Sequence, residues 1–374
     1  MERWLILINF KCVEDDFFFK KPKDFNKYSD KELLKYAVGA NLYMNGLMDV
    51  YNKIKDGTLE DCTTITVCFE DAINEENVLE AEYEFINNLE KISFELERGN
   101  LKYEDIPLIF IRVRNVNQFK SIASKIKKNT ANLIAGFVFP KFTVENGESY
   151  IAQTMITAQR LKEKFYIMPI LESENIIYKE SRIKTLLGIK ELLDKYKDIV
   201  LNVRVGGTDF SSKFGLRRSV NSTVYHIKVV EDCLIDIINI FSRVNDGYVI
   251  SGPVWEYFSD NPNSKEILGL RREIKMDIEN GFIGKTVIHP SQVNYVNLSH
   301  IVSYEDYKDA IHILKSKAEG GVFKGYGDNK MNEISPHLNW ARKIIERAEV
   351  FGVRKENFEG NKELLNIGAK EVLS

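Results

Sequence analysis

The chain has 374 residues, 44% of them hydrophobic, so it is long enough to bury a substantial core. Its 52 basic and 55 acidic residues give a formal net charge of −3, which excludes the strongly basic surface typical of nucleic-acid-binding proteins. Four cysteines without CxxC spacing argue against a disulfide-stapled secreted domain. The apolar run Trp4–Phe10 is too short to cross a membrane. We therefore expect a cytoplasmic protein without nucleic-acid or membrane partners.

Short apolar runs alternate with longer amphipathic segments along the chain. Residues 1–37 precede the first run and are expected to form an N-terminal extension or cap. The eight runs are Ala40–Met44, Ile65–Phe69, Leu108–Val113, Ala135–Phe139, Phe165–Ile170, Ile199–Val205, Tyr248–Ile250 and Thr286–Ile288. Each is bounded by Gly, Pro, Asn, Asp or Lys. Runs this short predict strands covered on both faces, as in a parallel sheet.

The segments between the runs predict helices with one apolar face. One such face is formed by Val230, Leu234, Ile237, Ile238 and Phe241. Another is assigned to Ile183, Leu186, Leu187, Ile189, Leu192 and Leu193. A β-then-α unit repeated eight times predicts an α/β fold, a closed (β/α)8 TIM barrel over residues 38–300, with an open doubly wound sheet as the alternative.

Residues 301–374 are expected to form C-terminal helices beyond the barrel. Glycines at Gly320-Gly321 and Gly325–Gly327 surround Phe323 and Tyr326. Such glycines suit a lid or an intersubunit flap, and ordinary loop flexibility is the alternative.

Polar residues collect where the predicted strands end, which is the end of a barrel that carries active sites. Glu172 and Asp209 follow the fifth and sixth strands at matching positions. Because neighbouring strands lie roughly 4.8 Å apart, these two carboxylates can reach one cation, and their oxygens suit Mg²⁺ or Mn²⁺. Such a metal stabilises charge that develops on an enolate oxygen. Helix capping or pairing with Arg is the alternative for these acids.

Further candidates follow the other strands. Arg112 offers a planar guanidinium for a substrate carboxylate, and a salt bridge to Glu70 or Asp71 is the alternative. The backbone of Gly206-Gly207 can approach a ligand closely, and Lys141 adds positive charge at the rim. Glu70 and Asp71 are expected to orient waters around the metal.

These segments together resemble the HpcH/HpaI aldolase and citrate lyase β-subunit family. The matching pieces run in order between Val38 and Phe351, and they are Val67–Ala72, Ile111–Asn115, Gly136–Lys141, Pro169–Glu172, Gly206–Phe210 and Gly284–Gln292. The N-terminal extension is similar to that of a citrate-lyase-like subgroup carried in bacterial tellurite-resistance and stress operons.

The resemblance implies a Mg²⁺-dependent lyase or aldolase that acts through an enolate on oxo- or hydroxy-acids or their coenzyme A (CoA) thioesters. It implies that Glu172 and Asp209 bind the metal, that Arg112 holds a substrate carboxylate, and that the chains form trimers or hexamers. In the malyl- and citramalyl-thioester branch, an acidic residue after a Met serves a neighbouring subunit's site as acid or base. Glu333, which follows Met331, lies nearest that position.

Several positions depart from the family pattern. Cys68 and Glu333 stand where an Asp is usual, Arg114 is additional, and no Arg leads into the first strand. The alternative is therefore an altered barrel that binds a metabolite or partner protein in a stress-response system without turning it over. A barrel acting on phosphoenolpyruvate or isocitrate is a further alternative, but its Lys-Cys-Gly-His type of motif is absent.

Overall fold

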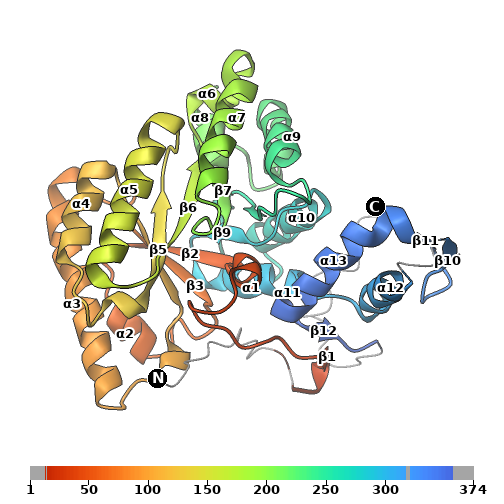
Figure 1. The fold of residues 1–374 in the computed structure, drawn as a ribbon, viewed down its shortest axis with the longest axis horizontal. Coiled ribbons are helices and arrows are strands. Elements are labelled where there is room, and N and C mark those ends of the chain that lie inside the picture. Colours follow the sequence, from red (N-terminus) through yellow and green to blue (C-terminus); the bar gives the residue numbers. More distant parts are fainter. Residues whose placement is uncertain (1–12, 14, 317–320, 357–374) are drawn as a thin grey trace.

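The computed structural model describes residues 13, 15–316 and 321–356 of the chain. Parallel strands form its centre, with helices α3 (Val78–Glu97), α4 (Val116–Lys125) and α5 (Val144–Leu161) on one side (Figure 1). On the other side lie α9 (Lys228–Phe241) and α10 (Lys265–Glu279). Two further helices, α12 (Tyr304–Lys315) and α13 (Ile334–Phe351), lie farther out as a separate layer.

The eight central strands close into a barrel. They are β2 (Ala40–Asn45), β3 (Thr64–Cys68), β4 (Leu108–Arg112), β5 (Ile134–Phe139), β6 (Tyr166–Leu171), β7 (Val203–Val205), β8 (Ile250–Ser251) and β9 (Lys285–Val287). From β3 to β8 each strand pairs in parallel with the one before it, and β2 also pairs with β9. A parallel bridge between Gly252 and Lys285 joins the remaining two edges. The predicted TIM barrel is therefore confirmed, and the open doubly wound sheet is wrong.

Helices cover the outside of the barrel. They are α2 (Val50–Lys55), α3 (Val78–Glu97), α4 (Val116–Lys125), α5 (Val144–Leu161), α6 (Glu174–Ile177), α7 (Lys179–Lys195), α8 (Gly207–Ser212), α9 (Lys228–Phe241), α10 (Lys265–Glu279) and α11 (Val293–Ser299). Alternate strand residues point to these helices and to the barrel axis. On β3, Ile65 and Val67 join the outer hydrophobic cluster. Thr66 faces inward, where its hydroxyl donates to the Asn41 side chain at 2.8 Å.

The predicted apolar faces are correct for α9 and partly wrong for α7. On α9, Val230, Leu234, Ile237 and Phe241 are buried and Ile238 packs against the same core. On α7, Leu186, Ile189, Leu192 and Leu193 are buried, but Ile183 and Leu187 are 47% and 50% exposed. The inward position one turn before Leu186 belongs to Arg182, which is 2% exposed. Its guanidinium donates to the carbonyls of Ile176 and Ile177 and to the Asp232 and Asp236 carboxylates.

The segment before the barrel closes the amino-terminal end of the strands. It contains β1 (Phe18–Lys20), which pairs antiparallel with β12 (Val353–Arg354), and α1 (Lys31–Ala37). The α1 residues Leu34, Tyr36 and Ala37 share a buried cluster with Phe110 and Tyr166 of the barrel interior.

A C-terminal layer packs beside the barrel. It consists of α12 (Tyr304–Lys315), α13 (Ile334–Phe351) and a hairpin of β10 (Val322–Lys324) and β11 (Met331–Glu333). The hairpin turn is held by Lys330, whose ammonium contacts Glu305, Asp306 and Asp309 of α12 at 3.0–3.1 Å. The predicted glycine-rich flap is therefore an ordered hairpin from Gly321 onward, and Gly320 lies outside the described residues.

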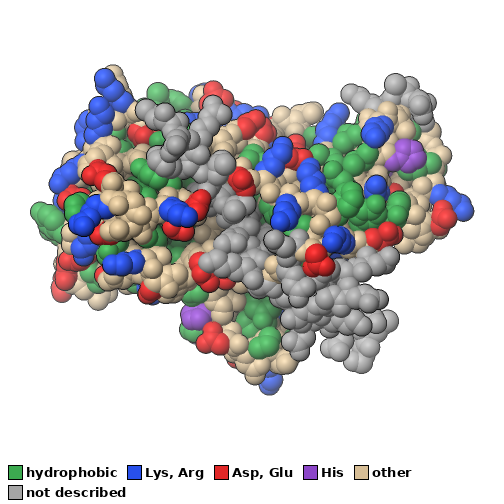
Figure 2. Space-filling view, turned by 90° about the horizontal axis from the view of Figure 1, so that it is seen from below, with side chains coloured by type: hydrophobic (Ala, Val, Ile, Leu, Met, Phe, Trp, Pro, Cys, Tyr) green, Lys and Arg blue, Asp and Glu red, His purple; other side chains and the backbone are tan. Residues whose placement is uncertain are grey.

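Exposed aromatic side chains gather on this layer. Figure 2 shows hydrophobic side chains together on the same side of the molecule as α12 and the hairpin. The rings of Phe19 and Tyr304 lie 4.8 Å apart, and those of Tyr304 and Tyr326 lie 5.4 Å apart. No helix within the described ranges combines the length and the apolar character needed to cross a bilayer.

Candidate active site

Glu172 is the most deeply buried acid at the carboxyl end of the strands. It directly follows β6 and is 3% exposed. Its Oε1 accepts a hydrogen bond from the backbone N–H of Lys141 at 2.8 Å and lies 3.6 Å from Arg112 Nη2. Burial raises the pKa of Glu172 to about 8; the Arg112 charge opposes this shift and the Asp209 charge adds to it. The carboxylate is thus held in a place where its charge is poorly compensated by protein alone.

Lys141 contributes its backbone as well as its side chain. Its φ of 48° lies in the left-handed region, which costs a residue with a Cβ roughly 1–3 kcal/mol. In this conformation its N–H donates to Glu172, while its half-exposed ammonium donates to Glu70 Oε1 at 2.6 Å. The sequence predicted only a positive charge at the rim.

Arg112 is paired with acids of the loop after β3. Its Nη2 lies 2.6 Å from Glu70 Oε2 and 3.3 Å from Asp71 Oδ2, and its Nη1 lies 3.5 Å from Cys68 Sγ. The salt bridge considered from the sequence is therefore present. The guanidinium is 7% exposed, and its Nε has no hydrogen-bond partner among the described residues.

Arg114 holds the loop that carries these acids. Its Nε donates to the Phe69 carbonyl at 3.2 Å, and its Nη2 donates to the Glu70 carbonyl at 3.0 Å and to the Ile73 carbonyl. This arginine, which is additional to the family pattern and follows β4, therefore binds backbone carbonyls of the loop after β3. These bonds keep Glu70 beside Arg112.

Asp209 lies in the first turn of α8, directly after β7. Its carboxylate is half-buried and has no hydrogen bond or salt bridge with any residue that the structure describes. Its charge nevertheless acts on Glu172, so the two acids of adjacent strands are neighbours, as predicted. Neither acid caps a helix: the N-cap of α8 is Gly206, which has no side chain.

The glycines before Asp209 make room for protein groups. A Cβ on Gly206 would lie 2.4 Å from both the Cβ and Oε2 of Glu172, and a Cβ on Gly207 would lie 2.9 Å from Pro253. The protein groups closest to these glycines are therefore Glu172 and Pro253, and the approach of the Gly206-Gly207 backbone to a ligand stays a prediction. Only glycine at position 206 leaves the Glu172 carboxylate where it is.

The residues at this end of the barrel fit a hard divalent cation. Glu172 and Asp209 bring carboxylates side by side, and the Asp209 carboxylate is unpaired within the described part of the chain. No cluster of three or more His, Cys, Asp or Glu side chains able to hold a metal occurs in the described ranges. A metal here would take two protein carboxylates and complete its shell with water or substrate, which is the arrangement that Mg²⁺ favours.

Two interior residues were missed from the sequence, Tyr43 of β2 and Arg204 of β7. Both face the barrel axis, and the Tyr43 ring lies 5.8 Å from the Arg112 guanidinium carbon and 5.7 Å from that of Arg204. The available signal was an arginine in the middle of an apolar run, because a charge inside a strand covered on both faces is costly.

Glu333 lies apart from this site within one chain. It is the last residue of β11, and its backbone N–H donates to His337 Nδ1 at 3.0 Å. Figure 1 shows β11 at the outer edge of the C-terminal layer, away from β6 and β7. Its role in a neighbouring subunit's site stays a prediction.

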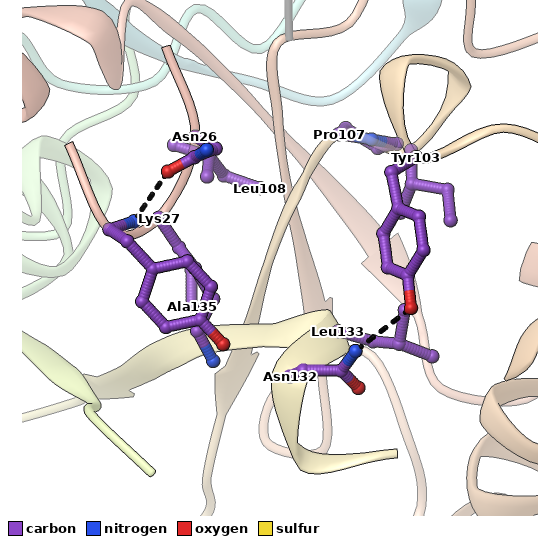
Figure 3. Close-up of a pocket in the computed structure, with 10 residues that line it drawn as sticks. Asn26, Lys27, Tyr103, Pro107, Leu108, Asn132, Leu133 and Ala135 are labelled. Atoms are coloured by element: carbon purple, nitrogen blue, oxygen red, sulfur yellow. Dashed lines mark hydrogen bonds between the residues drawn. The ribbon is translucent and has the colours of Figure 1, made fainter. Parts of the chain in front are cut away.

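Hollows among the described residues lie at the amino-terminal end of the strands, behind α8 and beside α3 and α4, the last with a volume of about 690 Å³. The cavity drawn in Figure 3 lies at the amino-terminal end of the strands, is lined by residues such as Asn26, Lys27 and Leu108, and has a volume of about 40 Å³. That volume suits one or two waters. A recess of about 290 Å³ lies behind α8, lined by Thr208, Arg217 and Glu256 among others.

Comparisons with known proteins agree with this architecture. A family model described as C-C bond lyase of the TIM-barrel fold matches residues 32–353. No curated protein matches the sequence.

Solved structures share the fold at low sequence identity. CitE of Mycobacterium tuberculosis, in complex with magnesium, acetoacetate and coenzyme A, is 18% identical with a TM-score of 0.54, over 84% of this chain and 99% of that one. The lead(II) complex of Haloferax volcanii malate synthase is 11% identical with a TM-score of 0.51, over 69% of this chain and 71% of that one.

Proposed function

This chain belongs to the C-C bond lyase family of the TIM-barrel fold, and we propose that its reaction is a Mg²⁺-dependent, aldol-type cleavage or condensation through an enolate. The substrate class is a 2-oxo or 2-hydroxy acid, free or as a CoA thioester. The observation that carries the proposal is the pair at the barrel mouth: Glu172, buried with a raised pKa, beside Asp209, which has no partner among the described residues.

Different groups of the chain bind the cation, position its ligands and bind the substrate. Glu172 and Asp209 hold the cation, which when bound supplies Lewis-acid stabilisation of negative charge on the substrate's carbonyl oxygen. The strained Lys141 backbone fixes Glu172. Glu70 and Asp71 keep the Arg112 guanidinium in one orientation, and Arg112 binds a substrate carboxylate through the donor that the acids leave free, Nε.

A homo-oligomer would complete the site, because a base is still needed to move a proton between substrate oxygen or carbon and the protein. We propose Glu333 of a neighbouring chain for this task. The hairpin that carries it exposes Val322 and Met331 at 63% and 58%, and apolar side chains this exposed suit contact with a second copy.

The test follows proton exchange by NMR. The purified protein is placed in D2O with Mg²⁺ and offered pyruvate, oxaloacetate and acetyl-CoA in turn. We expect metal-dependent deuterium incorporation into at least one of them, lost in Asp209→Asn and in metal-free protein. Glu174→Gln serves as the matched control, since Glu174 is an exposed acid next to the site whose ion pair is with the surface residue Lys213, at 3.3 Å.

Mg²⁺ binding is measured in parallel by calorimetry. Asp209→Asn and Glu172→Gln should each weaken it about tenfold or more. Glu172→Gln should do so with no fall in melting temperature, because it removes a buried carboxylate whose pKa is raised by burial. Metal binding without exchange on any substrate would favour the binding-only barrel. Unchanged Mg²⁺ affinity in both variants would exclude this pair as the metal site.

A further inference from the structure

Arg204 is a buried arginine with no acidic partner in the part of the chain that the structure describes. It is 1% exposed, and its Nη2 donates to Thr286 Oγ1 at 2.5 Å. Its Nε and Nη1 have no hydrogen-bond partner within the described residues, and no carboxylate there lies within salt-bridge distance of it. A guanidinium in this state is costly to bury, and a purely structural role would leave it paired, as Arg182 and Arg218 are.

The position of Arg204 relates it to the proposed metal site. In the β6–β7 register Arg204 lies beside Ile170, two residues below Glu172, which is roughly 6–7 Å along a strand. Both side chains point to the barrel axis. Arg204 therefore lies one interior layer beneath the carboxylates of the mouth.

The surroundings of Arg204 are polar. Tyr43 stands between Arg204 and Arg112 with its ring centroid within 6 Å of both guanidinium carbons. Although it is an interior residue, Tyr43 is only half-buried. Further donors without partners line the same interior, namely the side-chain amides of Asn41 and Asn202.

We infer that Arg204, with Tyr43 beside it, is a second carboxylate-binding site on the floor of the active site, so that the substrate is a dicarboxylic acid. This rests on the proposed function, in which the first carboxylate and its neighbouring oxygen face the metal. The second carboxylate extends along the barrel axis and accepts hydrogen bonds from the unused Nε and Nη1 groups of Arg204. A guanidinium suits this task because it forms directional, charge-assisted hydrogen bonds to carboxylates.

The test compares two acids with the same metal-chelating head. L-Lactate and L-malate share the 2-hydroxycarboxylate group, and L-malate adds one carboxylate. Calorimetry with Mg²⁺ present is expected to show that L-malate binds at least tenfold more tightly than L-lactate. In Arg204→Gln this preference disappears while L-lactate affinity stays within twofold of wild type, and Arg204→Lys restores part of it. Arg160→Gln, which removes an exposed arginine bonded to the Ala123 and Ile126 carbonyls, leaves the preference unchanged.

Stability provides a second readout. Because Arg204 is unpaired and buried, Arg204→Gln should raise the melting temperature of the ligand-free protein, whereas loss of a structural arginine would lower it. A malate preference that survives Arg204→Gln, equal wild-type affinity for both acids, or a lowered melting temperature would overturn the inference and leave the metal proposal standing. Lactate binding that is independent of Mg²⁺ would count against the metal proposal instead. Binding of neither acid would overturn the inference, and the Mg²⁺ titration would then decide the metal proposal separately.

Discussion

At the scale of single residues, the site depends on how closely backbone approaches the Glu172 carboxylate. Two neighbours determine its position: the Lys141 N–H, which donates to Oε1, and Gly206, whose missing side chain leaves space for Oε2. One neighbour adopts a strained φ, and the other must be glycine. The acid itself was recognisable from the sequence, but these two supports were not.

Gly206→Ala should weaken Mg²⁺ binding by about 10–100-fold, because the new Cβ would lie 2.4 Å from Glu172 Oε2 and displace the carboxylate. Calorimetry of Mg²⁺ binding checks this. Gly188→Ala is the matched control. Gly188 lies on α7, away from the site, and a Cβ there would lie 3.2 Å from Val144 Cγ2. Equal Mg²⁺ affinity of Gly206→Ala and wild type would mean that the Glu172 position is not tied to this glycine.

At the scale of elements, α7 shows how a polar residue can hold an inward position. Arg182 replaces an apolar side chain on the buried face, because the carbonyls of Ile176 and Ile177 and two carboxylates of α9 satisfy its donors. Ile183 and Leu187, four residues apart, then form an apolar pair on the outer face. The spacing of hydrophobic residues alone therefore placed Ile183 and Leu187 on the buried face and missed Arg182, which lies there.

The two leucines at neighbouring positions of α7 should therefore differ sharply in their effect on stability. Leu186→Ala should lower the free energy of unfolding by about 2–5 kcal/mol, because Leu186 is fully buried, with 0% exposure. Leu187→Ala should change it by less than about 0.5 kcal/mol, because Leu187 is 50% exposed. Urea denaturation with unchanged m-values measures both. A similar loss in the two variants would contradict the assigned helix face.

At the scale of the whole molecule, the N-terminal extension is tied to the barrel through Lys27. This ammonium is 6% exposed and donates to the carbonyls of Ala131 and Ile134 at 3.1 and 2.8 Å. It also lies 3.3 Å from Glu163 Oε1. Burial lowers the pKa of Lys27 from 10.5 to about 8, and the Glu163 charge opposes this shift.

The lowered pKa makes stability depend on pH in a defined window. Between about pH 8 and 10.5 the unfolded chain holds the Lys27 proton and the folded chain has lost it, so the free energy of unfolding rises with pH there. The total gain is on the order of 3 kcal/mol, at about 1.4 kcal/mol per pKa unit. Lys27→Met should lack this rise. Urea titrations of both proteins at about pH 7.5 and about pH 10 test the difference, and parallel pH profiles would contradict it.

The sequence by itself predicted the architecture and named the two acids that we propose as the metal ligands. Eight short apolar runs alternating with amphipathic segments were enough, because strands buried on both faces and helices buried on one leave different spacings of hydrophobic residues. Glu172 and Asp209 could be named because Glu172 directly follows its strand and Asp209 comes a few residues after the next one, and parallel strands bring their carboxyl ends to one side.

The tertiary structure alone decided which groups surround those acids. Three contacts show this: the pairing of Arg112 with Glu70 and Asp71, the Lys141 N–H on Glu172, and the position of Arg204 beside Ile170. Each joins residues more than 30 positions apart through the register of neighbouring strands. The spacing of residues along the sequence does not predict such contacts. Whether Arg204 has an acidic partner likewise depends on its neighbours in space. An arginine within an apolar run indicates a buried charge with a high desolvation energy, but it does not show whether an acid or a ligand compensates that charge.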